Sequence, residues 1–152
     1  MAADQAQDAQ DRTDPPDKLY VTAKAVVRRG DALLLLEERL PDGRTVLDLP
    51  GGRLDVGEDV RAGLERELAE ELGVGARSIG ALPVKVWTAV NGRGDGVVAL
   101  AYEVELETGD RTDAFDHTAS PEVLAARFVT AAEHAAAPDF LHRPAIDELL
   151  AG

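Results

Sequence analysis

The hydrophobic and polar residues of this chain follow two periods, one typical of strands and one typical of helices. Strand-like stretches come in pairs around turn residues: one pair flanks Gly30-Asp31 and another flanks the Asn- and Gly-rich run 91–96. Each pair predicts a β-hairpin. The apolar-rich segments that predict strands are 20–29, 32–37, 45–49, 82–90, 97–106 and 126–129.

A helical period occurs in the middle of the chain. Apolar residues recur at every fourth position over 58–72, which places them on one face of a helix: Val60, Leu64, Leu68 and Leu72. Gly73 is the kind of residue that ends such a helix. Shorter helices are predicted near 131–136 and 144–150, so the sequence as a whole predicts an α/β domain without internal repeats.

The first 17 residues differ in composition from the rest. They are rich in Ala, Asp and Gln, and they carry five Asp and one Arg. Such a polar stretch cannot bury enough apolar surface to fold, so we expect a disordered acidic tail over 1–17 and a folded domain over 18–152. The tail has no basic start followed by an apolar run, which argues against a secretory signal.

Charge and composition exclude several classes of function. The net charge is −13, whereas nucleic acids and anionic membranes are bound through surfaces rich in Lys and Arg. The hydrophobic content of 45% is normal for a globular domain, and 152 residues suffice for a sizeable core. The chain has no Cys and no stretch of membrane-spanning length, so disulfides are excluded and we expect a cytoplasmic protein.

Three carboxylates fall on one side of the predicted central helix. At 100° per residue, Glu67, Glu70 and Glu71 lie within roughly 100° of arc, at the rim of the apolar stripe. Like charges at this spacing repel one another, so we expect a cation among them. Oxygen ligands favour a hard divalent ion such as Mg²⁺ or Mn²⁺, while the absence of Cys and of a paired His motif argues against zinc.

These acids belong to a longer pattern that runs from Gly52 to Val74, GRLDVGEDVRAGLERELAEELGV. The pattern resembles the signature box of the Nudix family at every specified position, and weaker similarity in the order of elements extends over about 19–150. An ordinary acidic amphipathic helix would not require the glycine loop or the fixed spacing. The matching residues are Gly52, Glu58, Arg66, Glu67, Leu68, Glu70, Glu71, Gly73 and Val74.

The resemblance implies a fold, a reaction and a set of residue roles. The fold is an α/β/α sandwich around a mixed sheet, and the reaction is hydrolysis of a nucleoside diphosphate linked to another group. Metal-assisted attack of water on phosphorus would be completed by a Glu that accepts the proton. The implied metal ligands are Glu67, Glu70, Glu71 and the Gly51 carbonyl, and the implied catalytic residues are Glu67 as leading ligand or base, Arg66 as orienting partner and Glu58 as auxiliary.

Further acidic candidates lie outside this stretch. Glu122 precedes a strand as the family's late acidic residue does, and it is either an extra metal ligand or base, or a surface or capping acid. The polar segment 107–121 is a predicted active-site loop, and its Asp113 and Asp116 are the fallbacks for Glu122. We expect surface positions for the three histidines, which share no ligand spacing: His117, His134 and His142.

Three residues are candidates for binding the rest of the substrate. Trp87 and Tyr102 have rings that can stack on a nucleobase, although the only Trp of a small domain is more often part of the core. Arg53 follows the glycine loop and is either a phosphate-binding residue or a solvated one.

The sequence therefore favours a metal-dependent hydrolase that cleaves the pyrophosphate linkage of a nucleoside diphosphate derivative. An isopentenyl diphosphate isomerase has a related fold but relies on a catalytic Cys, which this chain lacks. A non-catalytic nucleotide sensor of the same fold is the other alternative, and the intact set of acids argues against it. ADP-ribose, a nucleotide sugar, a modified nucleoside triphosphate and a dinucleoside polyphosphate stay open as substrates, as does a homodimer.

Overall fold

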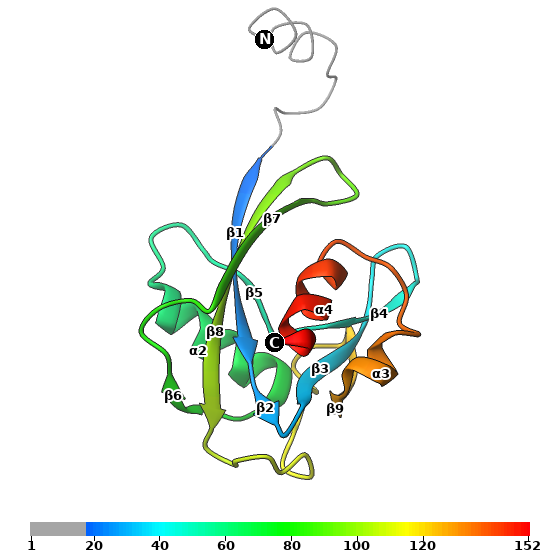
Figure 1. Ribbon diagram of the computed structural model, residues 1–152. Coiled ribbons are helices and arrows are strands. Elements are labelled where there is room, and N and C mark those ends of the chain that lie inside the picture. Colours follow the sequence, from blue (N-terminus) through cyan, green and yellow to red (C-terminus); the bar gives the residue numbers. More distant parts are fainter. Residues whose placement is uncertain (1–17) are drawn as a thin grey trace, which may run out of the picture.

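The computed structural model describes residues 18–152 (Figure 1), so the predicted tail at 1–17 lies outside the described residues. The helices are α2 (Val60–Leu72), α3 (Ala131–His134) and α4 (Arg143–Ala151). The strands are β1 (Leu19–Val26), β2 (Arg28–Arg29), β3 (Ala32–Arg39), β4 (Thr45–Asp48), β5 (Gly51–Arg53), β6 (Ala76–Ile79), β7 (Lys85–Val90), β8 (Gly96–Leu106) and β9 (Val123–Val129).

The strands form two sheets. The first has the order β5-β1-β8-β6, with β7 also pairing with β8, and the second has the order β2-β3-β4, with β9 pairing with β3. Strands β1 and β8 are parallel, whereas their other neighbours pair antiparallel. The predicted mixed sheet and α/β class are therefore confirmed.

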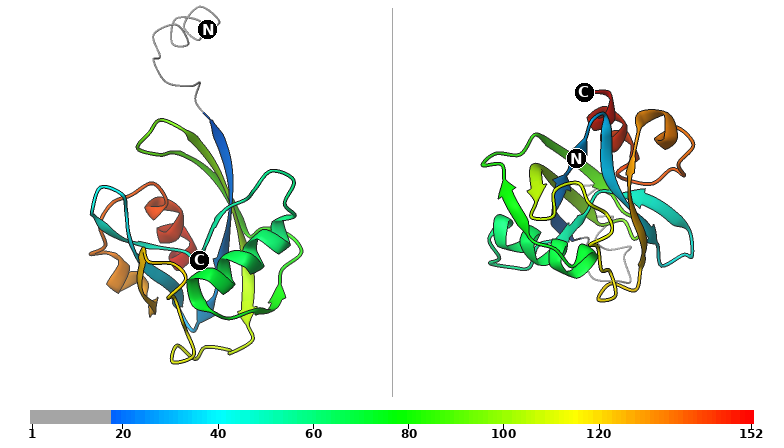
Figure 2. Two further views of the ribbon diagram at one scale, coloured as in Figure 1. Left: turned by 180° about the vertical axis from the view of Figure 1, so that it is seen from behind. Right: turned by 90° about the horizontal axis from the view of Figure 1, so that it is seen from below.

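Helices cover the first sheet from two sides (Figures 1 and 2). In Figure 1, α2 lies behind β1 and β8, while α4 lies in front of them, between the two sheets. Four consecutive leucines of β3 divide between the two cores: Leu34 and Leu36 pack with the leucines of α2, and Leu33 and Leu35 pack with Ile146 of α4. A strand buried on both faces reads as a continuous apolar run, which is what this segment shows.

Local signals explain the limits of α2. The Asp59 side chain accepts a hydrogen bond from the Ala62 N–H and caps the first turn, so the helix begins at Val60. The sequence had predicted a start near Glu58, which instead lies in the preceding loop. Gly73 ends the helix in a left-handed conformation with φ of 68°, as predicted.

The predicted hairpin over 20–37 is largely wrong, because only β2 pairs with the start of β3. Strand β1 belongs to the other sheet, where β5 and β8 are its neighbours. The position of β1 depends on its pairing with the distant strand β8, and the turn residues at Gly30-Asp31 carry no information about that pairing. The second hairpin, β7 and β8, is confirmed. No helix within 18–152 is both long and apolar enough to cross a membrane.

Candidate active site

The site is built on the segment Pro50-Gly51-Gly52, called the glycine loop below, whose two glycines begin β5 and lie close to both β1 and α2. Gly51 has φ of 130°, and a Cβ added there would lie 2.1 Å from the Ala23 carbonyl oxygen. A Cβ on Gly52 would lie 2.7 Å from the carboxylate of Glu67. Glycine is therefore required at both positions, for backbone conformation at the first and for the approach of a carboxylate at the second.

Glu71 is the most deeply placed of the three predicted ligands. Its side chain is buried and accepts a hydrogen bond of 2.7 Å from the Gly51 N–H. Burial raises the pKa of Glu71 to about 9, because a charged carboxylate is poorly solvated there. The sequence had placed this residue at the rim of the helix, and the structure places it inside.

Arg66 holds two further acids of the box. Its guanidinium donates to both carboxylate oxygens of Glu58 at 2.8 and 2.9 Å and to Glu67 at 3.0 Å. The hydrogen bonds from Arg66 lower the pKa of Glu58 to about 2. Burial raises the pKa of Glu67, although Arg66 opposes this. Glu70 lies one turn away, 3.6 Å from Arg66, and is exposed.

The donor set fits a hard divalent cation by its chemistry. Burial and the charge of Glu67 raise the pKa of Glu71, while burial and the charge of Glu70 raise the pKa of Glu67, and a cation beside these carboxylates would offset both effects. Within 18–152, no three carboxylate or imidazole groups are gathered closely enough to enclose an ion by themselves. The side chains of the predicted ligands Glu67 and Glu71 are instead bonded to Arg66 and to the Gly51 N–H.

A buried ion pair, which the sequence did not predict, lies next to the glycine loop. Lys24 of β1 and Asp48 of β4 are both buried, and their side chains are 2.9 Å apart. Lys24 lies opposite Gly51 in the β1–β5 pairing and also reaches the Leu49 carbonyl at 3.4 Å. Burial alone lowers the pKa of Lys24, but the charges of Asp48 and Glu71 outweigh it and raise the pKa.

A second missed residue, Glu38 at the end of β3, connects the late acid Glu122 with this region. Glu38 pairs across the sheet with Val123, the residue after Glu122. Burial raises the pKa of Glu38 to about 7, and the negative charges of Asp48, Glu122 and Glu67 add to the effect. Glu122 is thus on the same side of the molecule as the box acids.

The fallback residues lie elsewhere. Asp113 is exposed and pairs with Arg111, and the Asp116 N–H bonds the Leu72 carbonyl at the end of α2.

Strand register places two of the three substrate-binding candidates on one face of the first sheet. Trp87 lies opposite Ala99, Ala99 lies opposite Thr22, and Thr22 lies opposite Arg53, so these four side chains form one row. The guanidinium of Arg53 is 3.5 Å from the ring centre of Tyr20 on the same face. The two residues between Trp87 and Arg53 are small and buried, and the row ends at Arg53, directly after the glycine loop.

Tyr102 lies on the opposite face of the sheet. It is opposite Ala25 and packs against the core cluster that contains the leucines of α2. The structure therefore places Trp87 and Arg53 on one face of the first sheet, at the two ends of the row, and Tyr102 on the other face.

Two of the three histidines are buried, so the predicted surface positions are wrong for His134 and His142. His134 joins α3 to α4 through Asp147, at 2.7 Å. His142, just before α4, accepts a hydrogen bond of 3.0 Å from the Trp87 indole. Each buried histidine ring is hydrogen-bonded to one side chain that is distant in sequence, so the spacing of the histidines could not reveal it.

The hydrogen bond between Trp87 and His142 gives an optical test of the site. Burial lowers the pKa of His142 to about 4, below the ordinary 6.5 of an unfolded chain. The unfolded chain therefore binds more protons, and the stability that His142 contributes is lost as the pH falls from 6.5 towards 4. Emission of Trp87, the single tryptophan, should change with a midpoint near pH 4. A midpoint near 6.5, or the same change in His142→Phe, would contradict this.

Substitution of the two glycines of the loop by alanine should have different effects on stability and activity. Gly51→Ala strains the backbone and overlaps a main-chain carbonyl, so a loss of roughly 3 kcal/mol or more in unfolding free energy is expected in chemical denaturation. In Gly52→Ala the atoms nearest to the new methyl group belong to the Glu67 carboxylate, which can turn away, so this variant should stay folded but lose activity. Equal losses of stability in both variants would show that the contact with Glu67 is not the constraint at Gly52.

Comparison of the sequence with known proteins identifies the family to which this chain belongs. The NUDIX domain family matches residues 18–150. A putative 8-oxo-dGTP diphosphatase 2 of Mycobacterium tuberculosis is 38% identical over 113 residues, covering 70% of this chain and 73% of that protein. The chain therefore belongs to the NUDIX family. It is a Nudix hydrolase, an enzyme that acts on phosphorus-containing anhydrides.

Solved structures show the same fold. A NUDIX hydrolase from Nitrosomonas europaea has a TM-score of 0.69 at 20% identity, covering 88% of this chain and 87% of its own. The NUDIX domain of Shewanella oneidensis NrtR, solved with ADP ribose, has a TM-score of 0.62 at 16% identity, covering 98% and 96%. Identities this low support the fold alone.

Proposed function

We propose that this enzyme uses a divalent cation, Mg²⁺ or Mn²⁺, to cleave a phosphoanhydride bond of a nucleoside diphosphate derivative. The observation that carries the proposal is the meeting of Glu67 and Glu71 with the Gly51-Gly52 loop, where glycine is required for the approach. The proposed ligands are Glu67, Glu70, Glu71 and the Gly51 carbonyl. When bound, the cation would offset charge on the phosphoryl oxygens and lower the pKa of the attacking water.

The chain's own residues have distinct proposed roles in this reaction. Glu67 is the proposed proton acceptor, because it is half-buried and has a raised pKa while Arg66 fixes its direction. Arg66 is held in turn by two hydrogen bonds to Glu58, which makes Glu58 a positioning residue. Glu122, directly before β9 and close to Glu38, is the proposed second acid of the site.

The nucleoside is proposed to lie on the row that joins Trp87 to Arg53. An indole ring stacks on bases of any kind, and a guanidinium matches phosphate oxygens. The row ends at Arg53, directly after the glycine loop, so a base near Trp87 would leave its phosphates near the acids. We propose that Tyr102, on the other face, has a packing role instead.

An oxidised purine nucleoside triphosphate is the first substrate to test, given the name of the M. tuberculosis relative. ADP-ribose is the second, given the ligand of the Shewanella domain. The absence of Cys fits a reducing compartment, and the cytoplasm is the proposed location.

The test is a hydrolysis screen with product identification. The protein would be incubated with 8-oxo-dGTP, dGTP, ADP-ribose, a nucleotide sugar and a dinucleoside polyphosphate, each with Mg²⁺ or with a chelator. Separation of the products by ion exchange identifies the bond that is cut. We expect cleavage of at least one compound with Mg²⁺ and none with chelator. Nucleotide binding without any hydrolysis would instead favour the non-catalytic sensor.

A further inference from the structure

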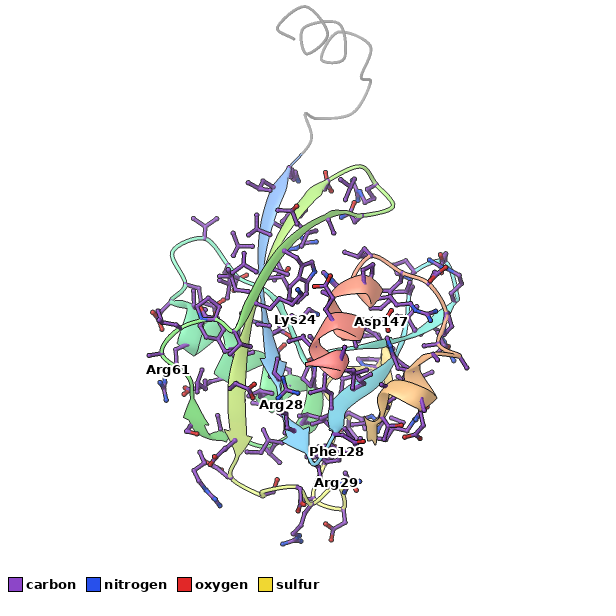
Figure 3. All side chains as sticks on the ribbon, viewed as in Figure 1. Lys24, Arg28, Arg29, Arg61, Phe128 and Asp147 are labelled. Carbon is purple, nitrogen blue, oxygen red and sulfur yellow. The ribbon has the colours of Figure 1, made fainter. Side chains whose placement is uncertain are left out.

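Lys24 is a charged residue in the interior of the molecule, and the proposed reaction gives it no role. Figure 3 shows Lys24 at the centre of the molecule, near α4. Its neighbours Ala23 and Ala25 pack with the leucines of α2, so the Lys24 side chain points to the opposite face of the first sheet. There its ammonium group meets Asp48, the last residue of β4 in the second sheet. The pair therefore joins the two sheets beside the glycine loop.

Stability alone does not explain a buried ion pair. Lys24 is 4% exposed and Asp48 is 7% exposed, and an apolar pair of similar volume is often at least as stable as two buried charges. A buried pair can instead fix one arrangement of the groups that it binds. The groups that Lys24 and Asp48 bind are therefore the evidence for their role.

Both residues bind the backbone of Leu49, just before the glycine loop. One carboxylate oxygen of Asp48 accepts from the Leu49 N–H at 2.7 Å, while the other is 2.9 Å from the Lys24 ammonium. The ammonium also donates to the Leu49 carbonyl at 3.4 Å. Leu49 is fully buried, and its backbone groups make no hydrogen bond to the backbone of another described residue. The ion pair therefore satisfies both groups.

The hydrogen bonds continue into the glycine loop. The Ala25 N–H donates to the Pro50 carbonyl at 2.8 Å, and the Gly51 N–H donates to Glu71 at 2.7 Å. Every polar backbone group from the Leu49 N–H to the Gly51 N–H therefore has a partner. The next group along the chain is the Gly51 carbonyl, a proposed metal ligand. Its direction depends on the bonds that precede it.

Strand register directs this carbonyl away from β1. Hydrogen-bonded and non-hydrogen-bonded positions alternate in an antiparallel pair. The Pro50 position is hydrogen-bonded to β1, so the next position, Gly51 opposite Lys24, is not. Gly51 therefore directs its N–H and its carbonyl to the free side of β5, where Glu71 accepts the N–H.

We propose that Lys24 and Asp48 are positioning residues of the metal site. By holding both backbone groups of Leu49, they fix the course of the chain into Gly51. The Gly51 N–H then orients Glu71, and the Gly51 carbonyl is aimed to the same side. This inference rests on the proposed function, because Gly51 and Glu71 are ligands only if a cation binds.

The loss of the pair has a defined consequence. The N–H and the carbonyl of Leu49 would have no partner in a buried place, and a buried backbone group without a partner is costly. Residues 48–51 can satisfy these groups only by moving, and the movement takes the Gly51 carbonyl with it. A stable protein with a displaced glycine loop is therefore the expected state of Lys24→Met/Asp48→Leu.

Hydrogen exchange of the Gly51 N–H in the metal-free protein is the first test. Its rate is measured by nuclear magnetic resonance relative to that of the Leu34 N–H, which bonds the Val27 carbonyl in the core. In Lys24→Met/Asp48→Leu, this ratio should rise at least about tenfold, because the loop opens locally.

Leu106→Ala is the matched control for a loss of stability without a change at the loop. Leu106 is 1% exposed and lies at the end of β8, five residues beyond Ala101, which pairs with Lys24. Truncation of a buried leucine lowers stability by an amount similar to that expected for Lys24→Met. In this control, the ratio of the Gly51 and Leu34 exchange rates should equal that of the wild type.

Mn²⁺ affinity is the second test. Lys24→Met/Asp48→Leu should bind Mn²⁺ at least about tenfold more weakly, the usual effect of losing a group that orients a ligand. Leu106→Ala should bind it as the wild type does. Asp48→Asn replaces the double variant if that one does not fold. Its amide has the same size but can accept from only one of Lys24 and the Leu49 N–H, so the same two changes should appear.

An unchanged exchange ratio at Gly51 in the folded variant would overturn the proposal. Faster exchange with the Mn²⁺ affinity of the wild type would also overturn it, because the position of the loop would then not matter to the metal. If the wild type itself binds no Mn²⁺, the proposed function fails, whereas the exchange of the Gly51 N–H still decides whether Lys24 and Asp48 fix the loop.

Discussion

Glu67→Gln is expected to lower kcat for phosphoanhydride hydrolysis by about 10³-fold, the scale of a lost general base. Gln keeps the size of the side chain and can still bond to its surroundings, but it can neither accept the proton nor supply a negatively charged ligand. The raised pKa of Glu67 and its contact with Arg66 suit it to this role. Steady-state rates with saturating Mg²⁺ on the substrate found by the screen measure the effect.

The matched control for Glu67→Gln is Glu65→Gln. Glu65 lies two residues earlier on α2, is exposed and faces Arg61 at 3.5 Å, away from the glycine loop. Its loss should change kcat less than about twofold, since an exposed pair of this kind contributes little. Near wild-type turnover by Glu67→Gln would show that another residue accepts the proton, and Glu38 and Glu122 would be the next candidates.

Lys24→Met should be the most destabilising of the single substitutions considered, with a loss of about 3–5 kcal/mol in unfolding free energy. The substitution leaves Asp48 buried and charged without its partner 2.9 Å away. Lys24→Met/Asp48→Leu removes both charges and should recover most of the stability, because an apolar pair can replace a buried ion pair. Urea denaturation of the three proteins at neutral pH measures these differences.

Lys24→Met/Asp48→Leu also shows whether the two charges are needed for activity as well as for stability. If Lys24 and Asp48 only support the fold, the recovered stability should come with recovered activity. If their charges also set the position of the loop that carries Gly51, activity should stay low in a stable protein. A single variant that loses less than about 1 kcal/mol would contradict the buried, paired arrangement of Lys24 and Asp48.

The sequence predicted well those features that are local. The spacing of Glu67 and Glu71 on one helix, the glycines before it and the end of α2 at Gly73 all follow from helix geometry and backbone preferences. The hairpin of β7 and β8 follows from alternation and turn residues. In each case, the residues that decide the structure are near one another along the chain.

Features that depend on distant pairing could not be predicted from the pattern. Strand β1 carries the apolar run of a hairpin strand, yet it pairs with β8, some 77 residues later. Lys24 has no neighbour in sequence that explains its burial, because Asp48 reaches it from β4. Likewise, Trp87 and His142 are 55 residues apart, so the buried partner of His142 was not visible in the spacing of histidines.

Mn²⁺ binding, followed by electron paramagnetic resonance, tests the central claim most directly. The signal of free Mn²⁺ should fall when the wild-type protein is added, and Glu65→Gln should behave in the same way. Glu67→Gln/Glu71→Gln should bind Mn²⁺ at least about tenfold more weakly, since it lacks two of the proposed ligands. Equal binding by the wild type and the double variant would contradict a metal site between α2 and the glycine loop.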